Sequence, residues 1–135
     1  MDRALIEKQL AHVVDSVARL RQLALPERLH DDPVQFGFTV HTLQTAVQAA
    51  IDVAAIIVAE RKLGEPSTNR DMFTKLAADG WLSTGQLEIW QRIVSFRNIV
   101  VHRYLDVDVA IVRAIVETHL EDLLEFVRCV HRRLG

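Results

Sequence analysis

The sequence predicts an all-α protein, a single domain over residues 1–135 folded as a bundle of about five helices. Apolar residues recur at helical spacing along most of the chain, and no segment has the pattern of a strand. Half of the 135 residues are hydrophobic, with only five glycines and three prolines, which is typical of a helical globular domain. No repeat and no linker divides the chain, so one core is expected.

The first helix is expected to begin after Asp2, which suits an N-cap, and to end near Leu23. Its apolar face consists of Leu10, Val13, Val14, Val17 and Leu20. Pro26 cannot continue this helix, because proline lacks the backbone N–H that a helix interior needs. Residues 26–31 are therefore expected to form a connector or a short turn.

The second helix has a strong predicted start, in which acidic caps at Asp31 and Asp32 precede Pro33 at the first helical position. It is expected to end near Leu63, with Gly64 as a left-handed C-terminal cap. Apolar residues surround most of this helix, which predicts that it is the centre of the bundle. Residues 33–51 carry no charge and are about long enough to span a membrane. Polar Gln35, His41, Gln44 and Gln48 within that stretch favour a soluble core helix, so no membrane partner is expected.

Three further helices follow. A short third helix is expected from Arg70 to Ala78, with Asn69 as its cap, and Gly80 ends it. Ser83 and Gln86 have the spacing of a capping box, which opens a fourth helix that runs to about Tyr104.

The fifth helix is expected to start at Asp106 or Asp108 and to continue to the C-terminus. An apolar seam runs along it, formed by Val109, Val112, Val116, Leu120, Leu123, Val127 and Val130. Its end is crowded with basic residues, as expected for cations that complement a helix dipole.

Composition limits the possible functions. The formal net charge of −2 argues against a protein that grips nucleic acid by bulk positive charge, so an RNA contact would need a local patch. The single cysteine, Cys129, excludes an intrachain disulfide and fits a reducing cytosol. No secretion signal opens the chain, and we therefore expect a cytoplasmic protein.

No metal site and no cofactor are expected. The histidines form no H-x₃-H or H-E-x-x-H ligand pair, and Cys129 has no CxxC partner. There is no glycine-rich phosphate loop and no GxSxG elbow, so a serine hydrolase is poorly supported. Asp52 lies on the apolar second helix, where we expect it to pair with a buried partner. Five histidines are expected to be structural: His12, His30, His41, His119 and His131.

One stretch, residues 96–104, differs from the rest of the chain. Arg97, Asn98, His102 and Tyr104, the only tyrosine, lie within eight positions on the fourth helix. At about 100° per residue, Asn98 and His102 share one face, within a polar stripe that adjoins an apolar one. Arg97 lies about 140° from His102, and a long arginine side chain can curl toward that polar edge.

These side chains suit RNA cleavage without a metal. A base can take the proton from a 2′-hydroxyl, which then attacks its own phosphate, and imidazole exchanges protons near neutral pH. A guanidinium stabilises the extra negative charge on the phosphorus by binding two oxygens at once. The spacing R-x₄-H is also common by chance, so the geometry permits this chemistry without requiring it.

The run Arg97-Asn98, His102 and Tyr104 reads R-N-x-x-x-H-x-Y, which closely resembles the motif of HEPN domains of the HepT type, toxins of toxin–antitoxin pairs. Residues 43–54, 69–73 and 119–123 also resemble that family, so the likeness extends from about Val34 to the C-terminus. The resemblance implies a HEPN-like bundle that acts as a homodimer, with the two motifs facing one cleft.

The resemblance also implies roles for single residues. Arg97 and His102 would be the catalytic pair of a metal-independent endoribonuclease, and Asn98 would support them. Tyr104 would be the position to which a nucleotidyltransferase (MNT) antitoxin adds AMP. Independently of the resemblance, a dimer with two copies of Arg97 would build the positive patch that the acidic chain lacks. Arg92 and Arg103 are further candidate RNA-binding residues in that patch, and a solvated surface is the favoured alternative for these two. Two alternatives stay open: a non-catalytic HEPN module that binds nucleotide or helps a nucleotidyltransferase recognise its substrate, and a plain helical dimerisation protein.

Overall fold

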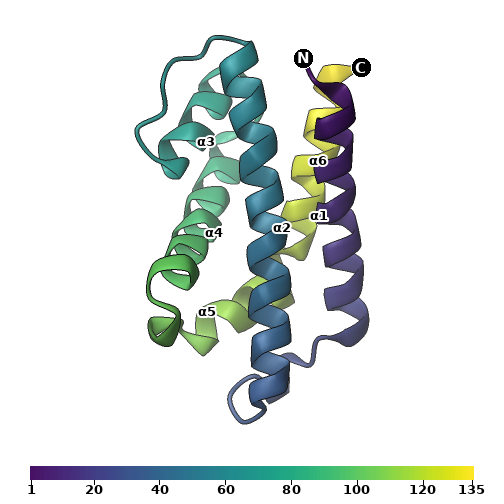
Figure 1. The fold of residues 1–135 in the computed structure, drawn as a ribbon, viewed down its shortest axis with the longest axis vertical. Coiled ribbons are helices and arrows are strands. Elements are labelled where there is room, and N and C mark those ends of the chain that lie inside the picture. The colour runs from purple at the N-terminus through teal and green to yellow at the C-terminus, as the bar shows by residue number, and fades with distance from the viewer.

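The computed structural model describes residues 1–135 and contains only helices and turns. The α-helices are α1 (Arg3–Leu23), α2 (Pro33–Glu60), α3 (Asn69–Ala78), α4 (Thr84–His102), α5 (Val109–Ala114) and α6 (Leu120–Leu134). Two 3₁₀ turns, η1 (Pro26–Arg28) and η2 (Tyr104–Asp106), and a π-helical segment, η3 (Ile115–His119), complete the chain. Figure 1 shows α2 in the middle, α1 and α6 on one side, α3 and α4 on the other, and α5 crossing below. The all-α prediction is confirmed.

The predicted helix starts are confirmed where polar side chains cap them. Asp2 accepts a hydrogen bond from the backbone N–H of Leu5, and Asp32 caps α2 in the same way. Ser83 and Gln86 form the predicted capping box at the start of α4. Helix α3 begins one residue earlier than expected, because Thr68 provides the cap in place of Asn69.

The predicted end of α2 is wrong by three residues. The helix ends at Glu60, and Lys62, with φ of 56°, takes the left-handed position. The backbone N–H of Leu63 bonds to the carbonyl of Val58 at 3.0 Å, and that of Lys62 bonds to Ala59 at 3.2 Å, as in a Schellman motif. Leu63 packs against the core at the position that follows the left-handed residue. This packing sets the end of the helix, and Gly64 lies beyond it.

The last predicted helix is one helical stretch with a wider turn inside it. Asp108 caps it by accepting from the backbone N–H of Ala110 at 2.8 Å. The π-helical segment η3 then accommodates one extra residue, as such segments do. As a consequence Ile115, rather than Val116, is the buried residue between Val112 and Leu120.

Helix α2 provides the centre of the core, as predicted. Thirteen of its residues are buried, and α1, α3 and α4 all contact it. By length and composition α2 is also the one helix that could cross a membrane, but 61% of that apolar window is buried inside the bundle. Burial of an apolar helix by its neighbours is expected for the core helix of a globular protein.

An aromatic cluster fixes the first half of α4. The rings of Phe73 in α3 and Trp90 in α4 are stacked with centroids 4.9 Å apart, and Phe126 of α6 lies 5.0 Å from Trp90. Aromatic pairs like these contribute about 0.5–1.5 kcal/mol beyond the area they bury. The N-terminal half of α4 is thus anchored on both sides, while its C-terminal end reaches the surface at the lower edge of the bundle (Figure 1).

Candidate functional site

The motif residues lie where α4 leaves the core. Phe96 is buried, Arg97 and Asn98 are half-buried, and His102, the last residue of the helix, is exposed. Tyr104 begins the 3₁₀ turn η2 and is 46% exposed. The chain therefore presents an imidazole and a phenol to solvent, five and seven positions after a half-buried guanidinium.

Arg97 is held by amide groups and by no carboxylate. Its Nη1 donates to Oδ1 of Asn98 at 3.2 Å, and its Nη2 donates to Oε1 of Gln48 on α2. Gln48 in turn donates from Nε2 to Oδ1 of Asp52, one helical turn further along α2, at 2.8 Å. This chain of contacts joins α2 to the motif.

The Nε of Arg97 is buried and has no acceptor. Leaving a buried donor unsatisfied costs about 1–3 kcal/mol, and more when the group is charged. A guanidinium has five N–H groups. The observed contacts use one from each terminal nitrogen, so the remaining N–H groups of Nη1 and Nη2 are left for another acceptor.

Arg97 differs from the arginines at the C-terminal end of the chain in that no carboxylate neutralises its positive charge. The hydrogen bonds that Arg128 donates to Glu121 and Glu125 raise the pKa of this arginine, and both carboxylates neutralise it. Arg97 forms no ion pair, nor do Arg92 and Arg103. The acidic molecule therefore carries unneutralised positive charge along α4 and at its end.

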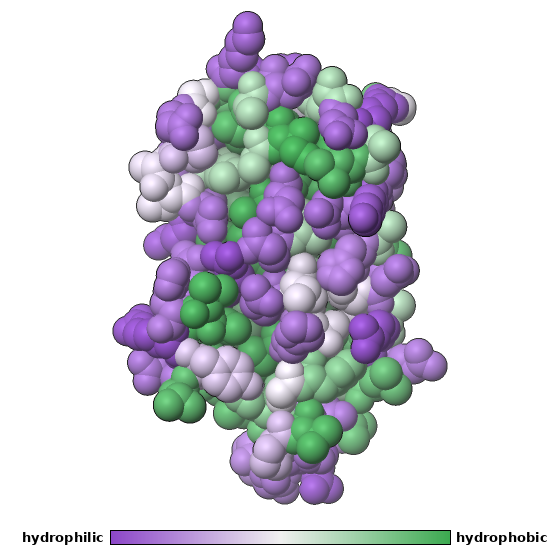
Figure 2. Space-filling model, in the orientation of Figure 1, coloured by the Kyte–Doolittle hydropathy of each residue, from purple (hydrophilic) through white to green (hydrophobic).

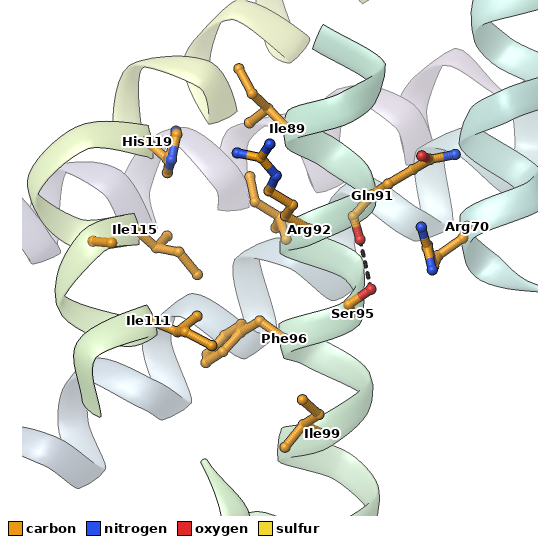
Figure 3. Close-up of a pocket in the computed structure, with 12 residues that line it drawn as sticks. Arg70, Ile89, Gln91, Arg92, Ser95, Phe96, Ile99, Ile111, Ile115 and His119 are labelled. Atoms are coloured by element: carbon orange, nitrogen blue, oxygen red, sulfur yellow. Dashed lines mark hydrogen bonds between the residues drawn. The ribbon is translucent and has the colours of Figure 1, made fainter. Parts of the chain in front are cut away.

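Arg92 lies in a groove beside α4. The groove has a volume of about 400 Å³ and runs between α4 and the α5–η3 stretch. Figure 3 shows Ile111 and Ile115 opposite Phe96, with Arg92 between α4 and His119. Most of the lining is apolar: Ile89, Ile93, Phe96, Ile99, Ile111, Ala114 and Ile115.

The structure brings only part of the motif into direct contact. The side chain of Asn98 accepts from Arg97 and makes no hydrogen bond with His102, although the two share one helix face. Arg103 is exposed and follows the end of α4. Tyr104 packs edge-on against Phe36 at the start of α2, with ring centroids 6.1 Å apart.

Gln48 was not predicted as a site residue. The sequence did single out Asp52 as a residue in need of a partner, and that partner is Gln48. The available signal was the i, i+4 spacing of two polar residues on a largely apolar helix.

The remaining histidines lie outside the motif, although His119 lines the groove that holds Arg92. Three of the five histidines expected to be structural lie against carboxylates: His119 with Asp122 and His131 with Glu7, each at 2.9 Å, and His30 with Asp31 at 3.8 Å. No group of three or more His, Cys, Asp or Glu side chains is placed to hold a metal ion.

Comparison with known proteins gives a consistent result. Residues 8–130 match the family described as "Ribonuclease HepT-like". The chain is 30% identical over 123 residues to the mRNA nuclease HepT of Shewanella oneidensis, covering 85% of this chain and 92% of that protein.

Solved structures of HEPN toxins have the same fold as this chain. A tri-AMPylated HEPN toxin from Shewanella oneidensis, bound to an MNT antitoxin, superposes with a TM-score of 0.88 at 28% identity over 98% of this chain and 99% of that one. A toxin–antitoxin complex with AMP-PNP gives a TM-score of 0.89 at 27% identity over 96% and 99%. YutE of Bacillus subtilis, a cytosolic protein of unknown function, shares the fold, with a TM-score of 0.89 at 15% identity over 99% and 91%. The chain belongs to the HepT-like ribonuclease family of HEPN toxins.

Proposed function

We propose that this protein is a cytoplasmic, metal-independent endoribonuclease toxin that acts as a homodimer and is neutralised by a nucleotidyltransferase antitoxin. One observation carries the proposal: a guanidinium fixed by amides and free of any carboxylate lies on the same helix end as an exposed imidazole. The family supplies the reaction class, because its members include an mRNA nuclease.

The reaction is a transesterification. His102 takes the proton of a ribose 2′-hydroxyl, the 2′-oxygen forms a bond to the adjacent phosphorus, and the bond from phosphorus to the 5′-oxygen breaks. The departing 5′-oxygen receives a proton. Arg97 binds the non-bridging oxygens, whose negative charge grows in the transition state, and Asn98 keeps the guanidinium in place.

A purified sample tests this proposal. We expect the protein to cut single-stranded RNA in the presence of EDTA at the rate seen without it, because no step uses a metal ion. Cleavage that stops in EDTA and returns with added Mg²⁺ would contradict the mechanism. A sample that binds RNA or nucleotide and never cuts would favour the non-catalytic HEPN module.

Tyr104 is the proposed site of neutralisation. Its exposed hydroxyl attacks the α-phosphorus of ATP, a new P–O bond forms and pyrophosphate leaves, while the phenolic proton passes to a base of the antitoxin. The added phosphate carries negative charge next to His102 and would compete with RNA for the cations of the motif. The AMPylated Shewanella oneidensis toxin supports this assignment.

Intact mass spectrometry checks the modification. Co-expression with an MNT nucleotidyltransferase antitoxin is expected to raise the mass by whole AMP units and to abolish RNA cleavage. The Tyr104→Phe variant should keep its original mass and stay active, because phenylalanine lacks the accepting oxygen. A mass increase that survives this substitution would place the modification elsewhere.

The homodimer is supported by the apolar surface around the site. Figure 2 shows hydrophobic groups, separated by polar ones, on the lower part of the face that it draws, and α4 ends in the same region of Figure 1. Leu105 there is 96% exposed, and Ile111 on the groove rim is 45% exposed. A second copy on this face would cover both residues. Two facing motifs would also supply two imidazoles, one to accept a proton and one to return it.

A matched pair of variants tests the interface. Ile111 and Leu5 each occupy the third position of a helix capped by aspartate, and they are 45% and 40% exposed. Ile111→Glu is expected to convert the dimer to a monomer and to reduce cleavage, while Leu5→Glu, on the far side of α2, should change neither. Light scattering after size-exclusion chromatography measures the mass. Two dimeric variants of equal activity would refute this interface.

A further inference from the structure

The contact between Gln48 and Arg97 links two helices that are distant in sequence. Gln48 lies in the middle of α2 and Arg97 near the end of α4, yet the Nη2 of Arg97 donates directly to Oε1 of Gln48. Asn98 is the second acceptor, from the same helix as the arginine. Both acceptors are neutral amides. They fix the plane of the guanidinium without cancelling its charge.

Asp52 determines which way the Gln48 amide points. An amide side chain has a donor end and an acceptor end, and the two could exchange by rotation. The carboxylate of Asp52 can only accept, and it takes the N–H of Gln48 Nε2 at 2.8 Å. The Oε1 atom is thereby turned toward Arg97. Since Asp52 is one helical turn from Gln48 on the rigid core helix, the orientation is set before any RNA binds.

A glutamate in place of Gln48 would neutralise the positive charge of Arg97, which the amide leaves intact. Elsewhere in the chain arginines are held by carboxylates, as Arg61 is by Asp79 and Arg128 by Glu121. A carboxylate in that position competes with a phosphate for the guanidinium. In this site the amide of Gln48 contacts Arg97, and the carboxylate of Asp52 contacts only Gln48. Asp52 therefore orients the amide, while the charge of Arg97 stays available to a phosphate.

We propose that Gln48 and Asp52 are positioning residues for Arg97, with Asp52 orienting the Gln48 amide and Gln48 holding the guanidinium for the RNA phosphate. This inference rests on the proposed ribonuclease function. Gln48 and Asp52 do not touch the RNA in this account, and they act only through Arg97. Both line a polar groove between α1 and α2, together with Gln44 and His12.

The decisive variant is Gln48→Glu, which has nearly the same shape. It is expected to place a carboxylate on Arg97 and to lower kcat/KM by about 10²-fold, the effect of misdirecting one catalytic group. Binding of fluorescein-labelled oligouridylate, measured in a His102→Ala background that does not cut, should also depend less on salt. The slope of log K against log salt should fall by about 0.7 for each phosphate that the protein no longer neutralises. A merely structural defect would not change that slope.

Two further variants remove the ambiguities. Gln44→Glu adds the same charge to the same groove one turn away, without any hydrogen bond to Arg97, and should leave rate and slope unchanged. Gln48→Glu combined with Asp52→Asn relieves the repulsion between two carboxylates, so it should be well folded by melting temperature and still inactive. Recovery of activity in this double variant would show that repulsion alone caused the loss, and would overturn the proposal.

The outcomes also separate this inference from the proposed function. If Arg97→Ala lowers the salt slope and the rate while Gln48→Glu changes neither, the positioning role is wrong and the ribonuclease mechanism stands. If Arg97→Ala itself leaves cleavage unchanged, the ribonuclease mechanism fails first.

Discussion

Replacing His102 with alanine is expected to lower kcat/KM for RNA cleavage by about 10²–10⁴-fold, the usual contribution of a general acid–base residue. The side chain is exposed at the end of α4 and makes no hydrogen bond within the chain, so the fold should be unaffected. Single-turnover cleavage of a labelled RNA, with the melting temperature measured in parallel, gives both quantities.

His41→Ala is the matched control, because His41 is also exposed on a helix but lies on α2, outside the motif. It should cut RNA at the wild-type rate. Equal activity in the two variants would remove His102 from the mechanism.

Replacing Arg97 is expected to have the second large effect. Arg97→Ala removes the group that stabilises the charged transition state, and losses of about 10²–10³-fold are usual for one such donor. Arg97→Lys should recover little of this, because an ammonium group cannot bond Gln48, Asn98 and a phosphate in one plane. The affinity for uncut RNA should fall in both variants, more in alanine than in lysine.

Arg113→Ala provides the control for Arg97. Arg113 is exposed on α5 and paired with Glu117 at 2.6 Å, so its charge is already neutralised. Its removal should leave RNA binding and cleavage unchanged. If the lysine variant at Arg97 were fully active, positive charge alone would be sufficient and the planar geometry of the guanidinium would have no role.

The sequence predicted the fold where local chemistry determines it. The caps at Asp2, Asp32 and Ser83 need only their own helix, and the structure has all of them. The end of α2 depends instead on tertiary packing, because the partly buried Leu63 packs against the core directly after the left-handed Lys62. A glycine nearby is then a misleading signal. The π-helical segment was also unpredictable, since the apolar spacing around Ile115 fits an ordinary helix equally well.

In the candidate site, too, features set by local sequence were predicted and features set by tertiary packing were not. The residues of the motif were found because they are close in sequence. Arg97, Asn98 and His102 lie on α4 as predicted, whereas α4 ends at His102 and Tyr104 lies in the turn η2 that follows. The partner of Arg97 could not be found in that way, because Gln48 is 49 positions away and meets it only when α2 packs against α4. Helical periodicity places Asn98 one turn before His102 on the same face. The long side chain of Arg97 nevertheless reaches Asn98 and donates to its Oδ1 atom. Side-chain reach, which helical spacing does not describe, decides that contact.

The most direct test of the mechanism is the chemistry of the RNA ends that the protein produces in EDTA. If His102 deprotonates the 2′-hydroxyl and Arg97 stabilises the transition state, the upstream fragment should end in a 2′,3′-cyclic phosphate. The downstream fragment should begin with a 5′-hydroxyl. Fragments that carry a 3′-hydroxyl and a 5′-phosphate would show that water attacked the phosphorus, and would contradict this account.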